Sequence, residues 1–203
     1  MSVSASTSLA LALISAASAA GSWCAAVGLP SLGLVAAAEL GIVLDRFPLV
    51  AAPASGRERE TRPSGRERET RPSGRERETG WAWVVAALLD ACDVVLACPG
   101  SLPAGVRPSD ARRLAVRARE RGSVLVVTGA WPEGADVRLQ LSASRWEGLG
   151  RGHGRLTGRR VEVVAGGRGA AARERRVALW LPHPDGGVAP WDPSPLDPAI
   201  PHR

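Results

Sequence analysis

Apolar residues along the chain fall into segments of two lengths, separated by glycine, proline and charged residues. The longer segments, at residues 6–20 and 81–91, have the length and the end residues of helices. Residues 110–121 predict a third helix, mostly charged, with Leu114, Ala115 and Ala118 facing inward and Ser109 as the expected cap. The shorter ones, at 23–29, 94–98 and 123–128, are continuous apolar runs, as expected of strands buried on both faces. Residues 34–40 and 47–51 predict one further helix and one further strand.

After Gly134 the pattern changes to alternation. Residues 136–142, 159–165 and 176–181 alternate as strands do, and Gly- and Arg-rich turns join them. Helix–strand units followed by a strand meander predict one α/β domain over residues 1–181, with a mostly parallel sheet flanked by helices and extended by C-terminal antiparallel strands. Pro, Gly and Asp dominate from Pro182 onward, which predicts a disordered tail over 182–203.

A tandem repeat of nine residues interrupts this domain. Ser-Gly-Arg-Glu-Arg-Glu-Thr-Arg-Pro begins at Ser55, recurs at Ser64 and starts a third time at Ser73, ending after Thr79. Because the repeat offers no apolar residue for packing, we expect a disordered insertion over 55–79. It is either a mixed-charge tether or a recent expansion of a coding repeat inside a tolerant loop, and we favour the second interpretation.

The net charge of +6 is carried without lysine, since all 26 basic residues are arginine. A positive balance favours DNA, RNA or an acidic protein surface as partner, and it equally fits solubility alone. Three cysteines without a CxxC spacing and three scattered histidines predict no metal site. An odd number of cysteines in apolar surroundings favours reduced thiols and a cytoplasmic location.

The N-terminal segment imitates a signal peptide, with an apolar run at 9–14 followed by small residues. The first basic residue is Arg46, however, so the positive charge that precedes a signal sequence is missing. No apolar segment reaches the roughly 20 residues that a membrane span needs, and we therefore expect no membrane association.

Several segments resemble the core of RecA-type ATPases. Residues 6–11 and 21–27 resemble the helix after a phosphate loop and the strand that follows it. Residues 93–98 resemble the Walker B strand, and 124–128 and 160–164 resemble later core strands. The resemblance implies a RecA-like core over most of residues 1–181.

Within RecA relatives, the segments at 21–24, 34–41 and 144–149 resemble the actinobacterial ImuA-type group. These are mutagenesis accessory proteins that act with a Y-family-related protein, ImuB, and an error-prone C-family polymerase. The resemblance therefore implies an ImuB-like protein and an error-prone polymerase as partners.

The chain departs from the RecA pattern where nucleotide is handled. Ser6 stands at the position of the phosphate-loop lysine, Thr7 keeps a hydroxyl, and the loop and strand before them are largely missing. Pro30 takes the place of the catalytic glutamate, Cys98 that of the Walker B aspartate, and Gly129 lies near the position of the nucleotide-sensing glutamine. Phosphoryl transfer depends on these groups together, so we expect neither an enzyme nor a bound nucleotide cofactor.

Two functions follow as hypotheses. The first is a non-catalytic adaptor that organises translesion polymerases on damaged DNA. The second is direct nucleic-acid binding by the Arg-rich C-terminal half, with Arg145, Trp146, Arg159 and Arg160 as candidate contacts. Trp191 in the tail is a candidate anchor for a partner. A Ser-His-Asp hydrolase is disfavoured, because the histidines lie in Gly- or Pro-rich segments without a nucleophile elbow.

Overall fold

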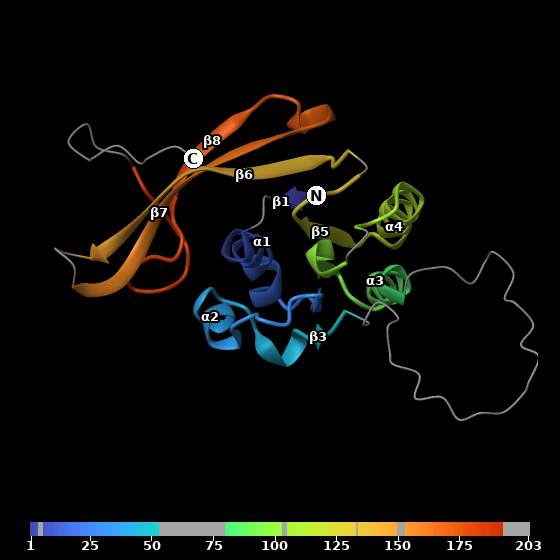
Figure 1. Cartoon of the computed structure of the whole chain (residues 1–203), viewed down its shortest axis with the longest axis horizontal. Coiled ribbons are helices and arrows are strands. Elements are labelled where there is room, and N and C mark those ends of the chain that lie inside the picture. The colour runs from blue at the N-terminus through green and yellow to red at the C-terminus, as the bar shows by residue number, and fades with distance from the viewer. Residues whose placement is uncertain (4–5, 53–79, 103–104, 133, 150–152, 193–203) are drawn as a thin grey trace, which may run out of the picture.

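The computed structural model describes residues 1–3, 6–52, 80–102, 105–132, 134–149 and 153–192. Within these ranges one mixed sheet has the strand order β3-β2-β4-β5-β1-β6-β7-β8-β9 (Figure 1). Its parallel half consists of β1 (Ser2–Val3), β2 (Cys24–Val27), β3 (Leu49–Val50), β4 (Val94–Ala97) and β5 (Val124–Thr128). Its antiparallel half consists of β6 (Val137–Leu149), β7 (Gly154–Gly167), β8 (Arg175–Trp180) and β9 (Ala189–Pro190).

Helices cover both faces of the parallel half. They are α1 (Thr7–Ala19), α2 (Leu34–Glu39), α3 (Gly80–Ala91) and α4 (Pro108–Arg121), with short 3-10 turns η1 (Leu44–Arg46), η2 (Pro99–Ser101) and η3 (Gly169–Ala171). Along β4, Val94 and Leu96 join the core with α1 and α2, whereas Val95 and Ala97 join the core with α3 and α4. This alternation explains why the strand is apolar throughout. The expected α/β class, with a parallel sheet extended by antiparallel strands, is confirmed.

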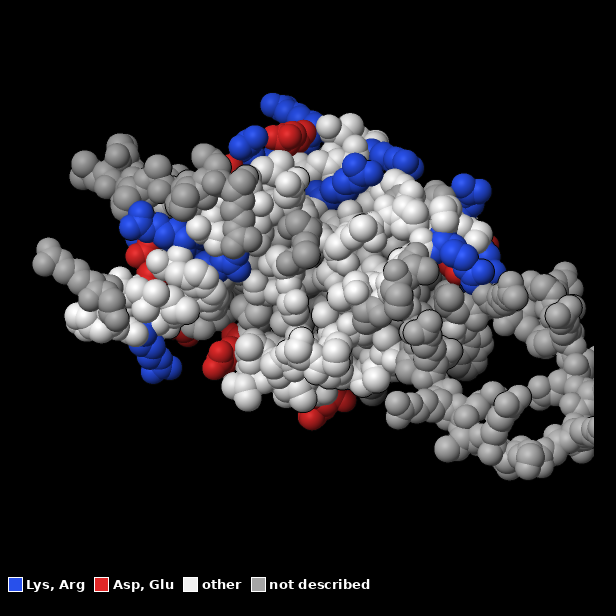
Figure 2. Space-filling view, in the orientation of Figure 1, with Lys and Arg blue, Asp and Glu red and all other residues white. Residues whose placement is uncertain are grey.

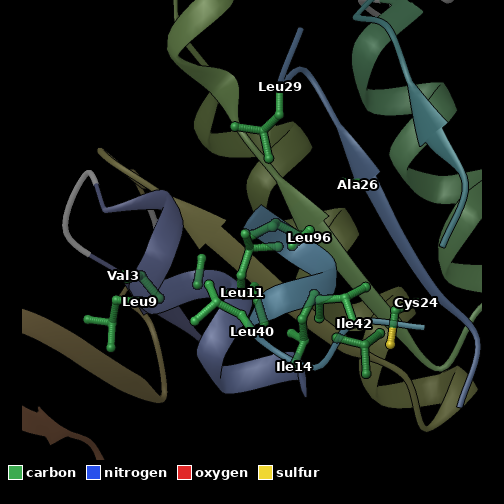
Figure 3. Packing of buried hydrophobic residues seen from close by; sticks show 14 of the residues in the cluster. Val3, Leu9, Leu11, Ile14, Cys24, Ala26, Leu29, Leu40, Ile42 and Leu96 are labelled. Atoms are coloured by element: carbon green, nitrogen blue, oxygen red, sulfur yellow. The ribbon is translucent and has the colours of Figure 1, made fainter. Parts of the chain in front are cut away.

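The local signals for α1 act as expected. The Ser6 hydroxyl caps the helix by accepting a hydrogen bond from the Leu9 amide at 3.3 Å. Leu9, Leu11 and Ile14 are buried in the core shared with β2 and β4, which Figure 3 shows from close by. Among the described residues, no helix combines the length and the apolar character needed to cross a membrane.

The start of α4 differs from the prediction. The helix begins at Pro108, Arg107 occupies the N-cap position, and Ser109, the expected cap, lies inside the first turn. Proline suits this place because its φ is already helical and the amide it lacks would have had no partner in the first turn. At the other end Gly122, with φ of 68°, closes the helix.

The strand expected to be largely missing before the first helix is present as β1. Ser2 pairs with Val127 of β5 and with Arg138 of β6, so this two-residue strand lies between the two halves of the sheet. Val3 is fully buried, and its carbonyl accepts a hydrogen bond from the Gly129 amide at 2.9 Å. Two residues are too few to show a hydrophobic pattern, and the flanking strands determine this pairing.

The C-terminal half is more extensive than expected. Strands β6 and β7 pair from Val137↔Gly167 to Leu149↔Gly154, well beyond the predicted segments. The chain also stays in the fold after Pro182, where a disordered tail was expected, because β9 pairs with β8 and the Trp191 amide donates a hydrogen bond to the Ala178 carbonyl at 3.1 Å. The prediction for residues 182–192 is therefore wrong. Residues 193–203 and the repeat at 55–79 lie outside the described residues.

Candidate functional site

The positions that stand where a RecA-type protein handles nucleotide lie at one edge of the sheet. Ser6 and Thr7 come after β1, Pro30 after β2, Cys98 after β4 and Gly129 after β5, so all follow the carboxyl ends of parallel strands. Backbone hydrogen bonds of 2.9 Å tie Cys98 to Val27 and Gly129 to Val3. In open α/β sheets ligands bind at this edge. We call these five positions the carboxyl edge.

At this edge the Ser6 side chain caps the first turn of α1. Ser6, at the position of the phosphate-loop lysine, directs its hydroxyl to the Leu9 amide and to the Ser8 hydroxyl, each at 3.3 Å. Thr7 is exposed. A capping serine can order the helix terminus, but it brings no positive charge to a phosphate.

The remaining positions of the carboxyl edge supply no acid, base or cation. Pro30 is exposed, the Cys98 side chain packs against the core around α1, and Gly129 has φ of 89° and no side chain. Within the described ranges, no three His, Cys, Asp or Glu side chains are close enough together to hold a metal ion. These five positions therefore combine turns after parallel strands with side chains that bring neither a carboxylate nor a cation.

Thr128, the last residue of β5, is a feature of this edge that sequence reasoning missed. It is 5% exposed, it pairs with Val3 across the strands, and its hydroxyl has no hydrogen-bond partner among the described residues. A buried hydroxyl without a partner is costly. The signal in the sequence was a polar residue that ends an otherwise apolar strand.

The candidate nucleic-acid contacts are divided between the two faces of the β6–β7 hairpin. Trp146 lies opposite Arg159, and Arg145 lies opposite Arg160. Since successive strand residues point to opposite faces, these four side chains form two separate pairs rather than one surface. On the first face, Arg159 stacks 5.5 Å from the centre of the half-exposed Trp146 ring and donates to the Ser144 hydroxyl at 2.7 Å.

On the second face, Arg160 is held within the fold. Its guanidinium lies 5.0 Å from the Trp180 ring and 5.1 Å from the Trp191 ring, and its Nε is 3.3 Å from a carboxylate oxygen of Glu147. Only 18% of the Arg160 side chain is exposed. Arg160 and Trp191, expected to contact nucleic acid and a partner, thus contact each other, and we call Arg160, Trp180 and Trp191 the tryptophan clamp.

The parallel half of the sheet carries a family signature. The sequence model of the MT3502 N-terminal domain matches residues 1–61 and 75–133, more than half of the chain. The chain belongs to the MT3502 family. The protein is also similar to the uncharacterized protein Rv3395c of Mycobacterium tuberculosis, with 30% identity over 174 residues that cover 82% of this chain and 72% of the relative.

The extent of the family match divides the candidate sites. All positions of the carboxyl edge, together with Thr128, lie within the matched residues. The β6–β7 hairpin and the tryptophan clamp lie beyond residue 133, outside the MT3502 N-terminal domain. The match also passes over residues 62–74, which belong to the nine-residue repeat.

Proposed function

We propose that this protein is a non-catalytic, RecA-like accessory protein that supports error-prone translesion DNA synthesis in the cytoplasm through contacts with an ImuB-like protein and an error-prone C-family polymerase. The RecA-like part is supported by the strand order. Strand β1 lies inside the sheet and leads directly into α1, as the strand and helix on either side of a phosphate loop do. The partners are those implied by the ImuA-type segments at 21–24, 34–41 and 144–149.

The observation that carries the non-catalytic part is the state of the carboxyl edge. Its backbone is held by hydrogen bonds between neighbouring strands, while Ser6 is engaged in capping α1. Loss of one catalytic group would leave a slow enzyme, but an ATPase needs a phosphate-binding cation, a magnesium ligand and a group that positions water together. A rigid scaffold without these groups suits a protein that acts by binding other proteins.

Calorimetry with ATP and magnesium tests the non-catalytic part. We expect no heat of binding at millimolar ATP for the full chain. Magnesium-dependent binding that is lost in a Thr7→Ala variant would contradict the proposal, since Thr7 is exposed and carries the remaining hydroxyl of the loop position.

Complementation in a host that lacks the gene tests the accessory part. We expect the deletion to lower damage-induced mutagenesis and the wild-type chain and Thr7→Ala to restore it equally. The purified chain should also retain the ImuB-like protein or the polymerase on a column. Normal mutagenesis in the deletion, with retention of neither protein, would reject the accessory role.

Direct binding of single-stranded nucleic acid is a second candidate, supported by Trp146. The residue is 46% exposed, and its ring stacks with Arg159 on the β6–β7 hairpin, an arrangement that can stack a base and contact a phosphate. We expect a Trp146→Ala variant to lose salt-sensitive binding to single-stranded DNA in fluorescence anisotropy. Trp83→Ala, which removes a 65% exposed ring from α3, is the matched control. Equal affinity in both variants would exclude this function for Trp146.

A further inference from the structure

The end of the sheet at β3 presents an apolar surface to solvent. Leu34 and Val35 of α2 are 45% and 74% exposed, Leu44 of η1 is 41% exposed and Leu49 of β3 is 39% exposed. These residues belong to three consecutive elements along the lower margin of Figure 1. The same margin of the space-filling view consists of white atoms with acidic atoms, in red, among them (Figure 2). We call Leu34, Val35, Leu44 and Leu49 the α2 patch.

The exposure follows from the position of these elements. α2 has the sequence Leu-Val-Ala-Ala-Ala-Glu, and among its residues only Ala37 is buried. Leu49 lies beside Ala26 of β2, whose side chain is in the core around α1. Among the residues that the structure describes, β3 is the edge of the sheet and no further strand pairs with it on its outer side. A helix that is apolar on nearly all sides is normally buried. Exposed apolar side chains on neighbouring elements are typical of sites of protein interaction.

The segment that carries the patch is slightly acidic, although the chain as a whole is basic. Between residues 30 and 52 the charged residues are Glu39, Asp45 and Arg46, two acidic and one basic, in a chain of net charge +6. Both carboxylates are exposed, and Glu39 lies one turn from Val35 on α2. Arg46 is half-buried, and its Nη2 points to the Ser18 carbonyl at 3.4 Å. The patch therefore presents an acidic rim, which repels nucleic acid and complements a basic protein segment.

We propose that the α2 patch binds an amphipathic helix of a partner protein, with aliphatic residues on one face and lysine or arginine on both flanks. The aliphatic side chains would cover Leu34, Val35, Leu44 and Leu49, while the flanking cations would face Glu39 and Asp45. This inference rests on the proposed accessory function, because an adaptor needs a surface for its partner. The tryptophan clamp and the carboxyl edge take no part in it.

Two synthetic helices serve as probes, one with leucine at heptad positions a and d and lysine at the others, the second with glutamate in place of lysine. In fluorescence anisotropy with the full chain, we expect the lysine helix to bind and the glutamate helix not to bind. The double variant Val35→Arg/Leu44→Arg should bind the lysine helix with an affinity lower by at least about tenfold. Glu39→Lys/Asp45→Lys keeps the apolar area and should reverse the preference toward the glutamate helix.

Val116→Arg is the matched control, because Val116 is 44% exposed on α4, on the opposite face of the sheet. Its affinity for the lysine helix should equal that of the wild type. All substituted residues are exposed, and an unchanged melting temperature will confirm that each variant is folded. Equal binding of the lysine helix by wild type and Val35→Arg/Leu44→Arg would overturn the proposal. So would a dimer in analytical ultracentrifugation that this double variant dissociates, since a second copy would then cover the patch.

Retention of the ImuB-like protein separates this inference from the accessory function. If Val35→Arg/Leu44→Arg retains that protein as the wild type does, the accessory function stands and the α2 patch is not its contact. A second outcome is that the double variant no longer binds the lysine helix, while the wild-type chain retains neither the ImuB-like protein nor the polymerase. The α2 patch is then a binding site for basic helices, and the proposed partners are wrong. If the wild-type chain binds the lysine helix and the ImuB-like protein and the double variant binds neither, the α2 patch and the accessory function are both supported.

Discussion

Replacing Trp191 by alanine tests whether the C-terminal segment is part of the fold. In the tryptophan clamp, Trp191 lies 5.1 Å from the Arg160 guanidinium on β7, and its amide donates a hydrogen bond to the Ala178 carbonyl of β8 at 3.1 Å. A free tail tryptophan that awaits a partner would contribute nothing to the stability of the isolated chain. A clamped one contributes both stacking and apolar burial, so the two interpretations predict different melting temperatures.

The expected magnitude follows from the surroundings of Arg160. Cation–π contacts contribute about 0.5–1 kcal/mol when exposed and about 2 when desolvated, and the Arg160 side chain is only 18% exposed. The Trp180 contact survives in the variant, so we assign about 1 kcal/mol to the Trp191 stack. Burial of part of the indole adds about 1 kcal/mol, for a total near 2 kcal/mol. For a chain of this size each kcal/mol lowers the melting temperature by about 2–4 °C, which predicts a decrease of about 4–8 °C.

Thermal unfolding followed by circular dichroism measures this decrease. Trp191→Phe keeps an aromatic face and should lose less than half as much stability. Trp83→Ala is the control, because its ring is 65% exposed, and it should change stability by less than about 0.5 kcal/mol. A melting temperature for Trp191→Ala within about 1 °C of the wild type would refute the clamp and return Trp191 to the role of a partner anchor.

Three further predictions concern Thr128, Gly148 and Cys24. Thr128→Val removes a buried hydroxyl without a described partner and should raise the free energy of unfolding by about 1 kcal/mol in urea titration, whereas a loss would reveal a partner in solution. Gly148→Ala should cost about 1–3 kcal/mol by the same assay, because φ is 97° and a Cβ would collide with the Arg155 carbonyl oxygen; Gly166→Ala, with open space, should not. Burial raises the pKa of the Cys24 thiol, and the Asp93 charge adds to the shift, so less thiolate forms at a given pH. Thiol labelling of Cys24 at mildly alkaline pH should therefore be slow, and rapid labelling of the folded chain would contradict this.

The elements that the sequence predicts best are those whose own residue types show that they are buried. Strands β2 and β4 are apolar at every position, and β5 is apolar up to its last residue, Thr128, because both faces of the sheet are covered; each therefore stands out as a continuous run. Strand β1 could not be found this way, since its pairing depends on Val127 and Arg138, more than a hundred residues away. Much of the added length of β6 and β7 is held by backbone hydrogen bonds between Gly- and Arg-containing segments, which hydropathy does not register.

The candidate sites show the same division. Location of the carboxyl edge needed only the order of strands, because the residues after parallel strands meet at one edge. Separation of Arg145 from Trp146 was also within reach, since adjacent strand residues face opposite sides. The tryptophan clamp was not, because it requires residues 181–190 to turn and bring Trp191 back over Arg160. The periodicity of apolar residues along the chain does not show where a segment turns back onto the sheet.

The place of β1 between the two halves of the sheet sets the order in which the protein can fold during synthesis. The ribosome makes residues 1–3 more than a hundred residues before their partners Val127 and Arg138, at a rate of about 5–20 residues per second. During that interval α1, with its buried Leu9, Leu11 and Ile14, has no completed sheet to cover. The nascent chain should therefore be a substrate for chaperones until β5 and β6 leave the exit tunnel, and ribosome stalling before that point should leave it sensitive to protease.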